Sequence, residues 1–448
     1  MRAKGEDEKT KDRGSEFLAK TRRRENGKTR KAFHAFWLML VMLLPATALA
    51  QIEPPSFNGY LRTYEGVLVG GEKQGDYAIV QNTLNLRWEQ KRGKVGFYAN
   101  PVLYHHQENS EQLDFIFRQA YLDLYFDSFD LRIGKQQIIW GKADGVFITD
   151  IISPKDFREF LLPDFDEIRI GVTAANLNYY LGNNTLQLVW VPVFQANEFP
   201  EANSLWAFQR RRFPVTPTFD HRTSTVPTNI DNSQIFARFA ALTSSLDFEL
   251  MAGYLFDATP TNHLTRVINP ATGGLEGLAV RPEHHRFSII GGSLAKTVAG
   301  VVVRCEGGFY RGKRFNTADL TVVDGVVETN FLHYLIGFDY NIFGIDVSGQ
   351  FIQEVILDYD EAIQSDQFNN TGTFLMKQDF RRETLNAELF VYYGFNEGDA
   401  LIRPKLTYDL ADGFEVVVGA NIFTGPQEGQ FGQFNENDMA YTKVKYSF

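Results

Sequence analysis

The feature that most constrains the fold is a segment of about ten residues with largely alternating polar and apolar side chains, which recurs along the chain between turns. In the stretch 78–90, AIVQNTLNLRWEQ, Asn85 and Arg87 fall on one face while Leu86 and Trp88 fall on the other. Successive side chains of a strand point to opposite faces, so each segment is expected to be a β-strand with one polar and one apolar face. No comparable helical periodicity appears after residue 50. The sequence therefore predicts an all-β protein.

The connections between these segments are alternately short and long. The short ones are KRGK, DSFD, LGNN, TSS, NIFG and ADG, and the longer, polar ones lie at 141–166, 199–231, 258–283, 313–329, 358–372 and 425–437. Short turns at one end and long loops at the other are the layout of a transmembrane barrel in an outer membrane. We therefore predict a single antiparallel barrel with short periplasmic turns and long external loops, closed because every backbone amide in the hydrocarbon layer needs a partner.

The predicted number of strands depends on the stretch 373–393, TFLMKQDFRRETLNAELFVYY. The count is 18 if this stretch turns at RRET (381–384), and 16 if it forms one long strand. We read it as two strands. An even number of strands returns the C-terminus to the periplasmic side, where the N-terminus begins.

A soluble sandwich, propeller or solenoid is the alternative fold. A propeller or solenoid requires an internal repeat, and only the alternating pattern repeats here, not the sequence. Aromatic residues make up 14% of the chain, and Tyr and Trp cluster near the ends of the expected strands, as they do at the two interfaces of a membrane. These features favour the transmembrane barrel.

The C-terminal stretch YTKVKYSF has the same alternation up to its last residue. Val444, Tyr446 and Phe448 share one face, and Lys443 and Lys445 share the other. We expect the first face to contact lipid and the lysines to face a water-filled interior. A terminal aromatic residue in this pattern resembles the signal that the barrel assembly machinery of the outer membrane recognises, so we expect that machinery as a partner.

Residues 1–50 have the character of a secretory signal peptide. The basic runs TRRR and KTRK precede the apolar run FWLMLVMLL and the small-residue site at Ala48–Ala50, and the signal is expected to be cleaved after Ala50. An apolar run of about 10 residues is shorter than the about 20 that a membrane helix needs; an uncleaved anchor is the alternative. No linker divides residues 51–448, which we expect to form one barrel domain in the Gram-negative outer membrane.

Charge and cysteine content argue against nucleic-acid binding and against an internal disulfide. Residues 1–50 carry 12 Lys/Arg and 6 Asp/Glu, so residues 51–448 keep 33 basic and 49 acidic groups, a net charge of −16. An acidic surface argues against nucleic acid as a partner. Cys305 is the only cysteine, so the chain forms no internal disulfide.

Two stretches resemble a known family. They are residues 131–171, LRIGKQQIIWGKADGVFITDIISPKDFREFLLPDFDEIRIG, and a C-terminal set running from LMKQDFRRETLNAELF through LTYDLADGFEVVVGANIFTGP to FGQFNENDMAYTKVKYSF. Both are similar to the proteobacterial outer-membrane proteins grouped as domain of unknown function 1302. The resemblance implies a porin-like barrel, of a kind often associated with systems that export envelope lipids or hydrophobic compounds, and it implies no particular solute.

The loop that follows the strand ending at Trp140 is the first candidate site. It mixes apolar groups with charges of both signs, and an external loop so apolar is better solvated when it folds into the barrel mouth. There it would narrow the pore, or alternatively only stiffen the wall. The expected constriction residues are Trp140, Lys142, Asp144, Asp150, Lys155, Arg158, Asp164 and Asp166.

Charged residues at inward positions of the strands are the second candidate site. Charges facing lipid are costly, so as a set they indicate a hydrated lumen, where they would influence ion preference and solute orientation. Each one could instead belong to an Arg–Glu pair that braces the wall. The expected lumen-lining residues are Arg87, Arg132, Arg169, Arg304, Glu306, Glu388, Arg403 and Lys405.

The histidines do not predict a metal or catalytic site. The pairs His105–His106 and His284–His285 are adjacent, and neighbours on a strand point to opposite faces. His221 and His263 lie in long loops, and no serine or aspartate nucleophile occurs at a recognisable catalytic spacing from them in the sequence. The sequence also lacks a phosphate-binding loop, a haem attachment motif and zinc-ligand spacing, so we expect no cofactor and no enzymatic activity.

The sequence therefore predicts a channel for small or amphiphilic solutes, acting passively or coupled to a partner such as an envelope transporter. A barrel that serves as a scaffold for a periplasmic transporter or cytochrome is the alternative, and a barrel enzyme is a further one. The basic run Arg210–Arg212 is a candidate contact with lipopolysaccharide phosphates, or simply a solvated loop.

Overall fold

The computed structural model describes residues 54–448, except 108–110, 210–214, 244–245 and 273. The expected signal peptide and the basic run Arg210–Arg212 lie outside the described residues. Within the described part of the chain, no helix is long and apolar enough to cross a membrane.

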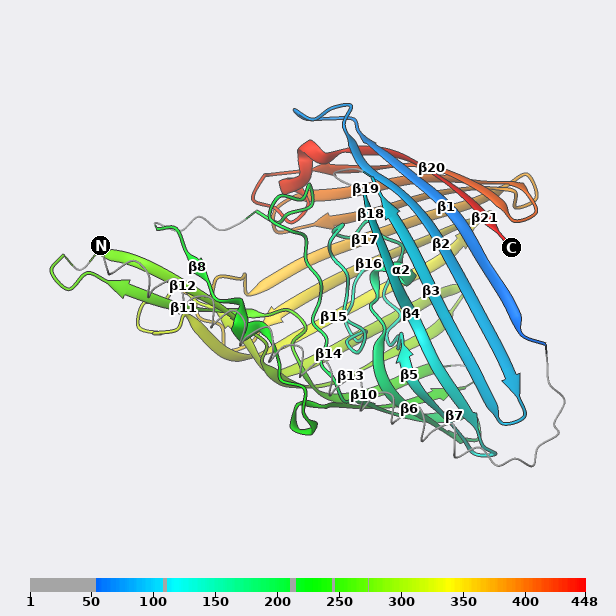
Figure 1. Ribbon diagram of the computed structural model, residues 1–448, viewed down its shortest axis with the longest axis horizontal. Coiled ribbons are helices and arrows are strands. Elements are labelled where there is room, and N and C mark those ends of the chain that lie inside the picture. Colours follow the sequence, from blue (N-terminus) through cyan, green and yellow to red (C-terminus); the bar gives the residue numbers. More distant parts are fainter. Residues whose placement is uncertain (1–53, 108–110, 210–214, 244–245, 273) are drawn as a thin grey trace, which may run out of the picture. The chain divides into compact units, whose positions relative to one another are not determined.

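Eighteen antiparallel strands form a closed barrel, as predicted (Figure 1). Each strand pairs with the next one along the wall, and β21 pairs with β1 to complete the ring. The strands of the first half are β1 (Ser56–Leu68), β2 (Tyr77–Arg92), β3 (Val95–His106), β4 (Gln112–Tyr125), β5 (Phe129–Gln136), β6 (Val172–Leu181), β7 (Asn184–Val191), β9 (Gln234–Leu242) and β10 (Asp247–Phe256). Those of the second half are β13 (Arg286–Val298), β14 (Val301–Asn316), β15 (Val326–Ile342), β16 (Ile345–Ile356), β17 (Phe368–Phe380), β18 (Leu385–Gly394), β19 (Asp399–Ala411), β20 (Phe414–Thr424) and β21 (Met439–Ser447).

The two faces of the wall follow the alternation in the sequence. On β2, Leu86 and Trp88 are each 38% exposed, whereas Asn85, on the opposite face of the strand, is fully buried. Outward apolar side chains recur around the ring, including Ile290 on β13 and Ile336 on β15. So large an apolar surface is unfavourable in water and favourable in a lipid bilayer.

The turn at RRET settles the strand number. Residues 381–384 join β17 to β18, and Arg381, Arg382 and Glu383 all adopt positive φ angles of 51°, 59° and 70°. The stretch 373–393 is therefore two strands, as predicted. Short turns join strands at this end of the barrel. The connections at the opposite end span 69–76, 107–111, 137–171, 192–233, 257–285, 317–325, 357–367, 395–398 and 425–438.

Four of the expected long loops contain more strand than predicted, and the one expected at 358–372 ends early because β17 begins at Phe368. The connection after β10 carries the hairpin β11 (Thr261–Ile268) and β12 (Leu275–Glu283), which pairs with β8 (Thr218–Phe219) and projects beyond the barrel wall (Figure 1). The loop expected at 313–329 shortens to 317–325, because β14 and β15 continue their pairing as far as Asn316 and Val326.

The connection 137–171, which we call the inner loop, lies inside the barrel and carries the short helix α2 (Phe165–Ile168) (Figure 1). Its apolar residues are buried in three clusters, one of which joins Ile148 to Leu335 and Ile352 of the wall. Phe160 and Leu162 pack with wall residues such as Tyr392 and with residues of the long loops. Ile152 belongs to a second cluster, with Ile289 of the wall. Burial against the inner wall and the long loops explains how a connection this apolar stays out of water.

Candidate pore constriction

A buried carboxylate of β14, that of Glu306, holds the first half of the inner loop. Glu306 accepts the backbone N–H of Lys142 at 2.6 Å and both the backbone N–H and the hydroxyl of Thr149, at 2.9 and 2.7 Å. Glu306 is only 4% exposed. Backbone N–H groups that donate to a buried carboxylate form strong, directional hydrogen bonds. This contact therefore fixes the path of the loop along the wall.

Arg304, two residues earlier on β14, holds the same part of the loop. Its guanidinium donates to the carbonyl of Lys142 at 2.8 Å and to the carboxylates of Asp144 and Asp339, both at 2.6 Å. Gln350 on β16 also donates to Asp144, at 2.7 Å. Asp144 is thus anchored to two neighbouring regions of the wall.

A glycine allows the loop to touch β18. Gly145 has a φ of +86°, and a Cβ at this position would lie 2.7 Å from the ring of Tyr392. The hydroxyl of Tyr392 donates to the carbonyl of Gly145 at 3.1 Å. A side chain here would therefore face both an unfavourable backbone conformation and a steric clash.

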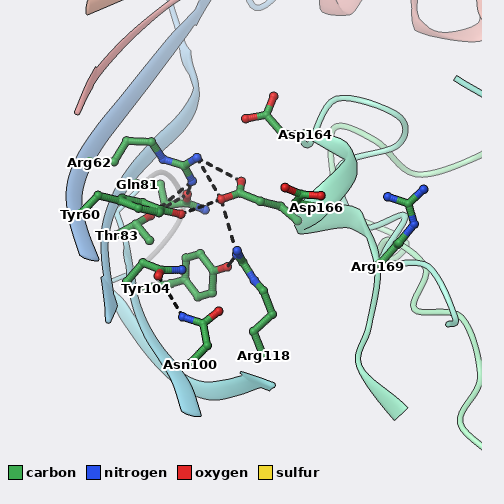
Figure 2. A network of polar contacts seen from close by, with 12 residues as sticks. Tyr60, Arg62, Gln81, Thr83, Asn100, Tyr104, Arg118, Asp164, Asp166 and Arg169 are labelled. Atoms are coloured by element: carbon green, nitrogen blue, oxygen red, sulfur yellow. Dashed lines mark hydrogen bonds and ion pairs between the residues drawn. The ribbon is translucent and has the colours of Figure 1, made fainter. Parts of the chain in front are cut away.

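The far end of the loop is held by a cluster of cations on the opposite wall (Figure 2). Glu167 of α2 accepts two bonds from Arg62 of β1, at 3.0 and 3.1 Å, and one from the hydroxyl of Tyr60 at 3.0 Å. Arg118 of β4 lies 3.4 Å from the same carboxylate and also donates to the hydroxyl of Tyr104. The side chains of Arg62, Arg118 and Glu167 are 6%, 8% and 16% exposed.

Asp164 and the loop carbonyls complete this attachment. Asp164 lies 3.4 Å from the ammonium group of Lys443 on β21, and Arg403 of β19 donates to the carbonyls of Leu161 and Leu162 at 2.9 and 2.8 Å. Burial by itself raises the pKa of Asp164, but the surrounding cations, Lys443 first, lower it to about 2. Burial also tends to raise the pKa of Glu167. The positive charges of Arg62 and Arg118 have the larger effect, so the pKa of Glu167 is lowered.

Several of the expected constriction residues stabilise the loop itself. Asp150 accepts from Arg169 at 2.7 Å and lies 3.6 Å from the ammonium group of Lys155, which also donates to the Asp150 carbonyl. Trp140 is buried and donates to Gln187 of β7 at 2.8 Å. These residues brace the loop or join it to the wall.

The remaining expected constriction residues are exposed. Arg158 pairs with Asp156 at 2.5 Å and with Glu198 of the next long connection at 3.3 Å. Asp166 is exposed beside Asp164 (Figure 2). Of the expected set, Lys142, Asp144 and Asp164 are thus the ones that form ion pairs with the wall strands.

The expected lumen-lining residues on the wall occur mostly as pairs between neighbouring strands. Arg132 binds Asp123 at 2.7 Å and stacks on the ring of Tyr121, and Lys405 binds Glu388 at 2.8 Å. Arg304, Glu306 and Arg403 hold the inner loop, Arg87 is exposed on the polar face of β2, and Arg169 lies in the inner loop itself.

Sequence reasoning missed the strongest attachment of the loop. Tyr60, Arg62, Arg118 and Glu167 were absent from the predicted sites, and they converge from three regions far apart in the sequence. The inward position of Arg62 follows from the alternation in β1. Its pairing with Glu167, 105 positions away, depends on how the barrel closes.

A cavity of about 450 Å³ opens above the inner loop, at the end with the long connections. Aromatic and apolar groups line it together with charged groups of both signs. They include Phe147, Leu161, Phe287, Lys155, Lys313 and Glu354. Lys313 is paired with Asp257 at 2.6 Å. The cavity therefore offers both apolar surface and ionic groups to a solute that reaches the loop.

Comparisons with known proteins agree with this architecture. A family model described as protein of unknown function (DUF1302) matches residues 61–448. No curated protein sequence matches the chain significantly.

Solved structures share the fold at low sequence identity. Acinetobacter baumannii OccAB1 has a TM-score of 0.53 at 10% identity, covering 90% of this chain and 98% of its own. Pseudomonas aeruginosa OccK2 (OpdF), in complex with glucuronate, has a TM-score of 0.51 at 9% identity, with 89% and 98% covered. Pseudomonas aeruginosa OpdK, with vanillate, has a TM-score of 0.50 at 12% identity, with 89% and 99% covered. At these identities the likeness shows the fold, that of the porin-like barrels of outer membranes.

Proposed function

Because the chain belongs to the family described as protein of unknown function (DUF1302) and has a porin-like barrel fold, we propose that it is an outer-membrane channel whose pore is narrowed by the inner loop. Solutes would cross by diffusion through the hydrated lumen, with or without coupling to an envelope transporter. The solved structures that share its fold are porin-like barrels, which supports the same proposal.

The observation that carries this proposal is the attachment of the inner loop to opposite walls. Glu306 and Arg304 of β14 hold residues 142–149, while Arg62 of β1 and Lys443 of β21 hold residues 164–167. A loop that only covered the wall would need contacts on one side. Contacts on both sides carry it across the lumen, where it restricts passage.

The lining of the cavity supports amphiphilic solutes as cargo. Phe147, Leu161 and Phe287 provide apolar surface beside Lys155 and Glu354. Structures of OpdK with vanillate and of OpdF with glucuronate show that barrels of this fold hold small organic acids. For the present chain we favour an acid with an apolar body, because such a body can displace water from the aromatic lining.

Planar-bilayer recordings of the purified chain test the proposal. The wild-type protein should give discrete conductance steps, and replacing residues 144–162 by a short Gly/Ser linker should enlarge them. Replacing residues 269–274, the turn of the β11–β12 hairpin outside the lumen, should leave the conductance unchanged. Absence of conductance in all three proteins would refute the channel, and equal conductance in all three would refute the role of the loop.

Liposome swelling tests the solute class. Proteoliposomes should admit vanillate faster than glucuronate, and glucuronate faster than a neutral sugar of similar size. A neutral sugar that enters fastest would contradict the proposed preference.

The location follows from the same proposal. The outward apolar rows need a bilayer. Tyr446 of the last strand and Phe448 just after it are 47% and 50% exposed on that outer face. With Val444 they form the C-terminal pattern that we propose is read by the barrel assembly machinery. Lipopolysaccharide would then surround the ends that carry the long connections.

A further inference from the structure

A group of metal-binding side chains lies at the base of the β11–β12 hairpin, away from the inner loop. His263 of β11, Glu283 at the end of β12 and His285 just after it place one ligand atom each within 4.8 Å of one another. Among the described residues, no other set of three or more His, Cys, Asp or Glu side chains converges in this way.

The two imidazoles face each other directly. Their Nε2 atoms are 2.7 Å apart, and the carboxylate of Glu283 lies 3.9 Å from Nε2 of His263. Two imidazole nitrogens on one tetrahedral ion are about 3.3 Å apart when each Zn–N bond is about 2.0–2.1 Å. A shift of roughly half an ångström between the two rings would therefore admit an ion.

A carboxylate sets the tautomer of His263. Nδ1 of His263 lies 3.0 Å from Asp324, in the β14–β15 connection, so that nitrogen carries the proton and donates it to the carboxylate. The lone pair of the neutral ring is then on Nε2, which points at His285 and Glu283. A carboxylate behind a histidine in this manner orients the ring and increases its basicity at many metal sites.

The surroundings leave the ligands accessible. His263 is 6% exposed, whereas the side chain of Glu283 is 30% exposed, so water can complete the coordination of an ion.

We propose that His263, Glu283 and His285 bind a divalent transition-metal ion, with Asp324 orienting His263. Two imidazoles and one carboxylate suit Zn²⁺ and its neighbours in the first row, and they suit Mg²⁺ or Ca²⁺ poorly, because those ions prefer oxygen ligands. The bound ion ties the projecting hairpin to the start of β13 and, through Asp324, to the β14–β15 connection.

This site could not be recognised from the sequence, for a geometric reason. The neighbours His284 and His285 point apart: His284 bonds to the carbonyl of Asp257 at 2.7 Å and packs against Phe194. The two side chains of this adjacent pair therefore have different partners. The second imidazole comes from His263, which the pairing of β11 with β12 brings to the same end of the hairpin.

The proposal is tested by calorimetric titration. The full chain in detergent micelles is first treated with a chelator and is then titrated with Zn²⁺ alone. Wild-type protein should bind one ion per chain at micromolar concentration, and Co²⁺ should give the visible absorption of a low-coordinate site. Asp324→Asn should weaken binding about 10- to 100-fold, as expected for an outer-shell partner, and His285→Gln should weaken it more than that. His284→Gln is the matched control and should bind as the wild type does.

Folding and binding can be separated in this experiment. His263 is buried, so His263→Gln can disturb the hairpin, whereas His285 and Glu283 are partly exposed and their variants should keep the far-ultraviolet circular dichroism of the wild type. Absence of Zn²⁺ binding by the wild type, unchanged binding by His285→Gln, or equal loss in His284→Gln would each overturn the proposal.

Discussion

Glu167→Gln should release the α2 end of the inner loop while leaving its shape almost unchanged. The carboxylate accepts bonds from Arg62 and Tyr60 and lies beside Arg118, and all of these groups are largely buried. The amide keeps the size of the side chain but removes its charge. Two buried guanidinium groups then lose their main counter-charge.

The expected cost follows from this burial. Removing one partner of a buried ion pair costs about 3–5 kcal/mol, and water in the lumen places this case near the lower value. A loss of about 3 kcal/mol raises the ratio of detached to attached loop roughly 150-fold. The wild-type cluster has three cations, Arg62, Arg118 and Lys443, against the two anions Glu167 and Asp164. The substitution therefore changes its net charge from +1 to +2.

Single-channel recording measures both effects. The variant should show frequent transitions to a larger conductance, and its reversal potential in a KCl gradient should shift toward anion selectivity. The shift should be greater at 0.1 M salt than at 1 M, because the screening length falls from about 10 Å to about 3 Å.

Asp166→Asn is the matched control. It removes the same charge from the same turn of helix, at an exposed position one residue away. If Asp166→Asn produced the same transitions as Glu167→Gln, charge alone would explain the effect and the proposed attachment through Arg62 would be refuted.

Two further predictions follow from pH and from the lipid face. The pKa of Asp164 is lowered from 3.8 to about 2, so the attachment of the loop through its negative charge is complete above pH 4 and is lost only as pH falls through 2. Conductance in bilayer recordings should therefore stay constant from pH 7 to pH 4. A transition within that range would contradict this assignment. Ile336 is 43% exposed on the outer face of β15, and Ile336→Arg should lower the free energy of unfolding from lipid vesicles by about 2–4 kcal/mol. Guanidinium titration with Ile336→Ala as the control measures this cost, and equal stability of the two variants would argue against lipid contact there.

The strands could be predicted because their two faces contact different media. Trp88 lies on the apolar, outer face of β2 and its neighbour Arg87 on the opposite, polar face, so the period of two in the sequence reflects the two faces of the wall. The turn at 381–384 was recognisable because polar residues interrupt this alternation. The β11–β12 hairpin was read as a loop, since a small sheet outside the membrane has no lipid face to impose a long alternating pattern.

The attachments of the inner loop could not be predicted in the same way. Its apolar residues indicated burial within the mouth, but the partner of each charge depends on which strands face one another across the ring. Asp150 and Lys155 were expected among the constriction residues, but their pairing with each other within the loop was not predicted. Glu167 was overlooked because nothing local distinguishes it from Asp164 and Asp166.

The attachment of Glu167 to Arg62 and of Asp164 to Lys443 has a consequence for biogenesis. Arg62 is on the first strand and Lys443 is on the last, and these strands pair only when the ring is complete. The two acidic residues therefore bridge the joint from within. If the inner loop narrows the pore as proposed, this narrowing is complete only when the first and last strands have paired.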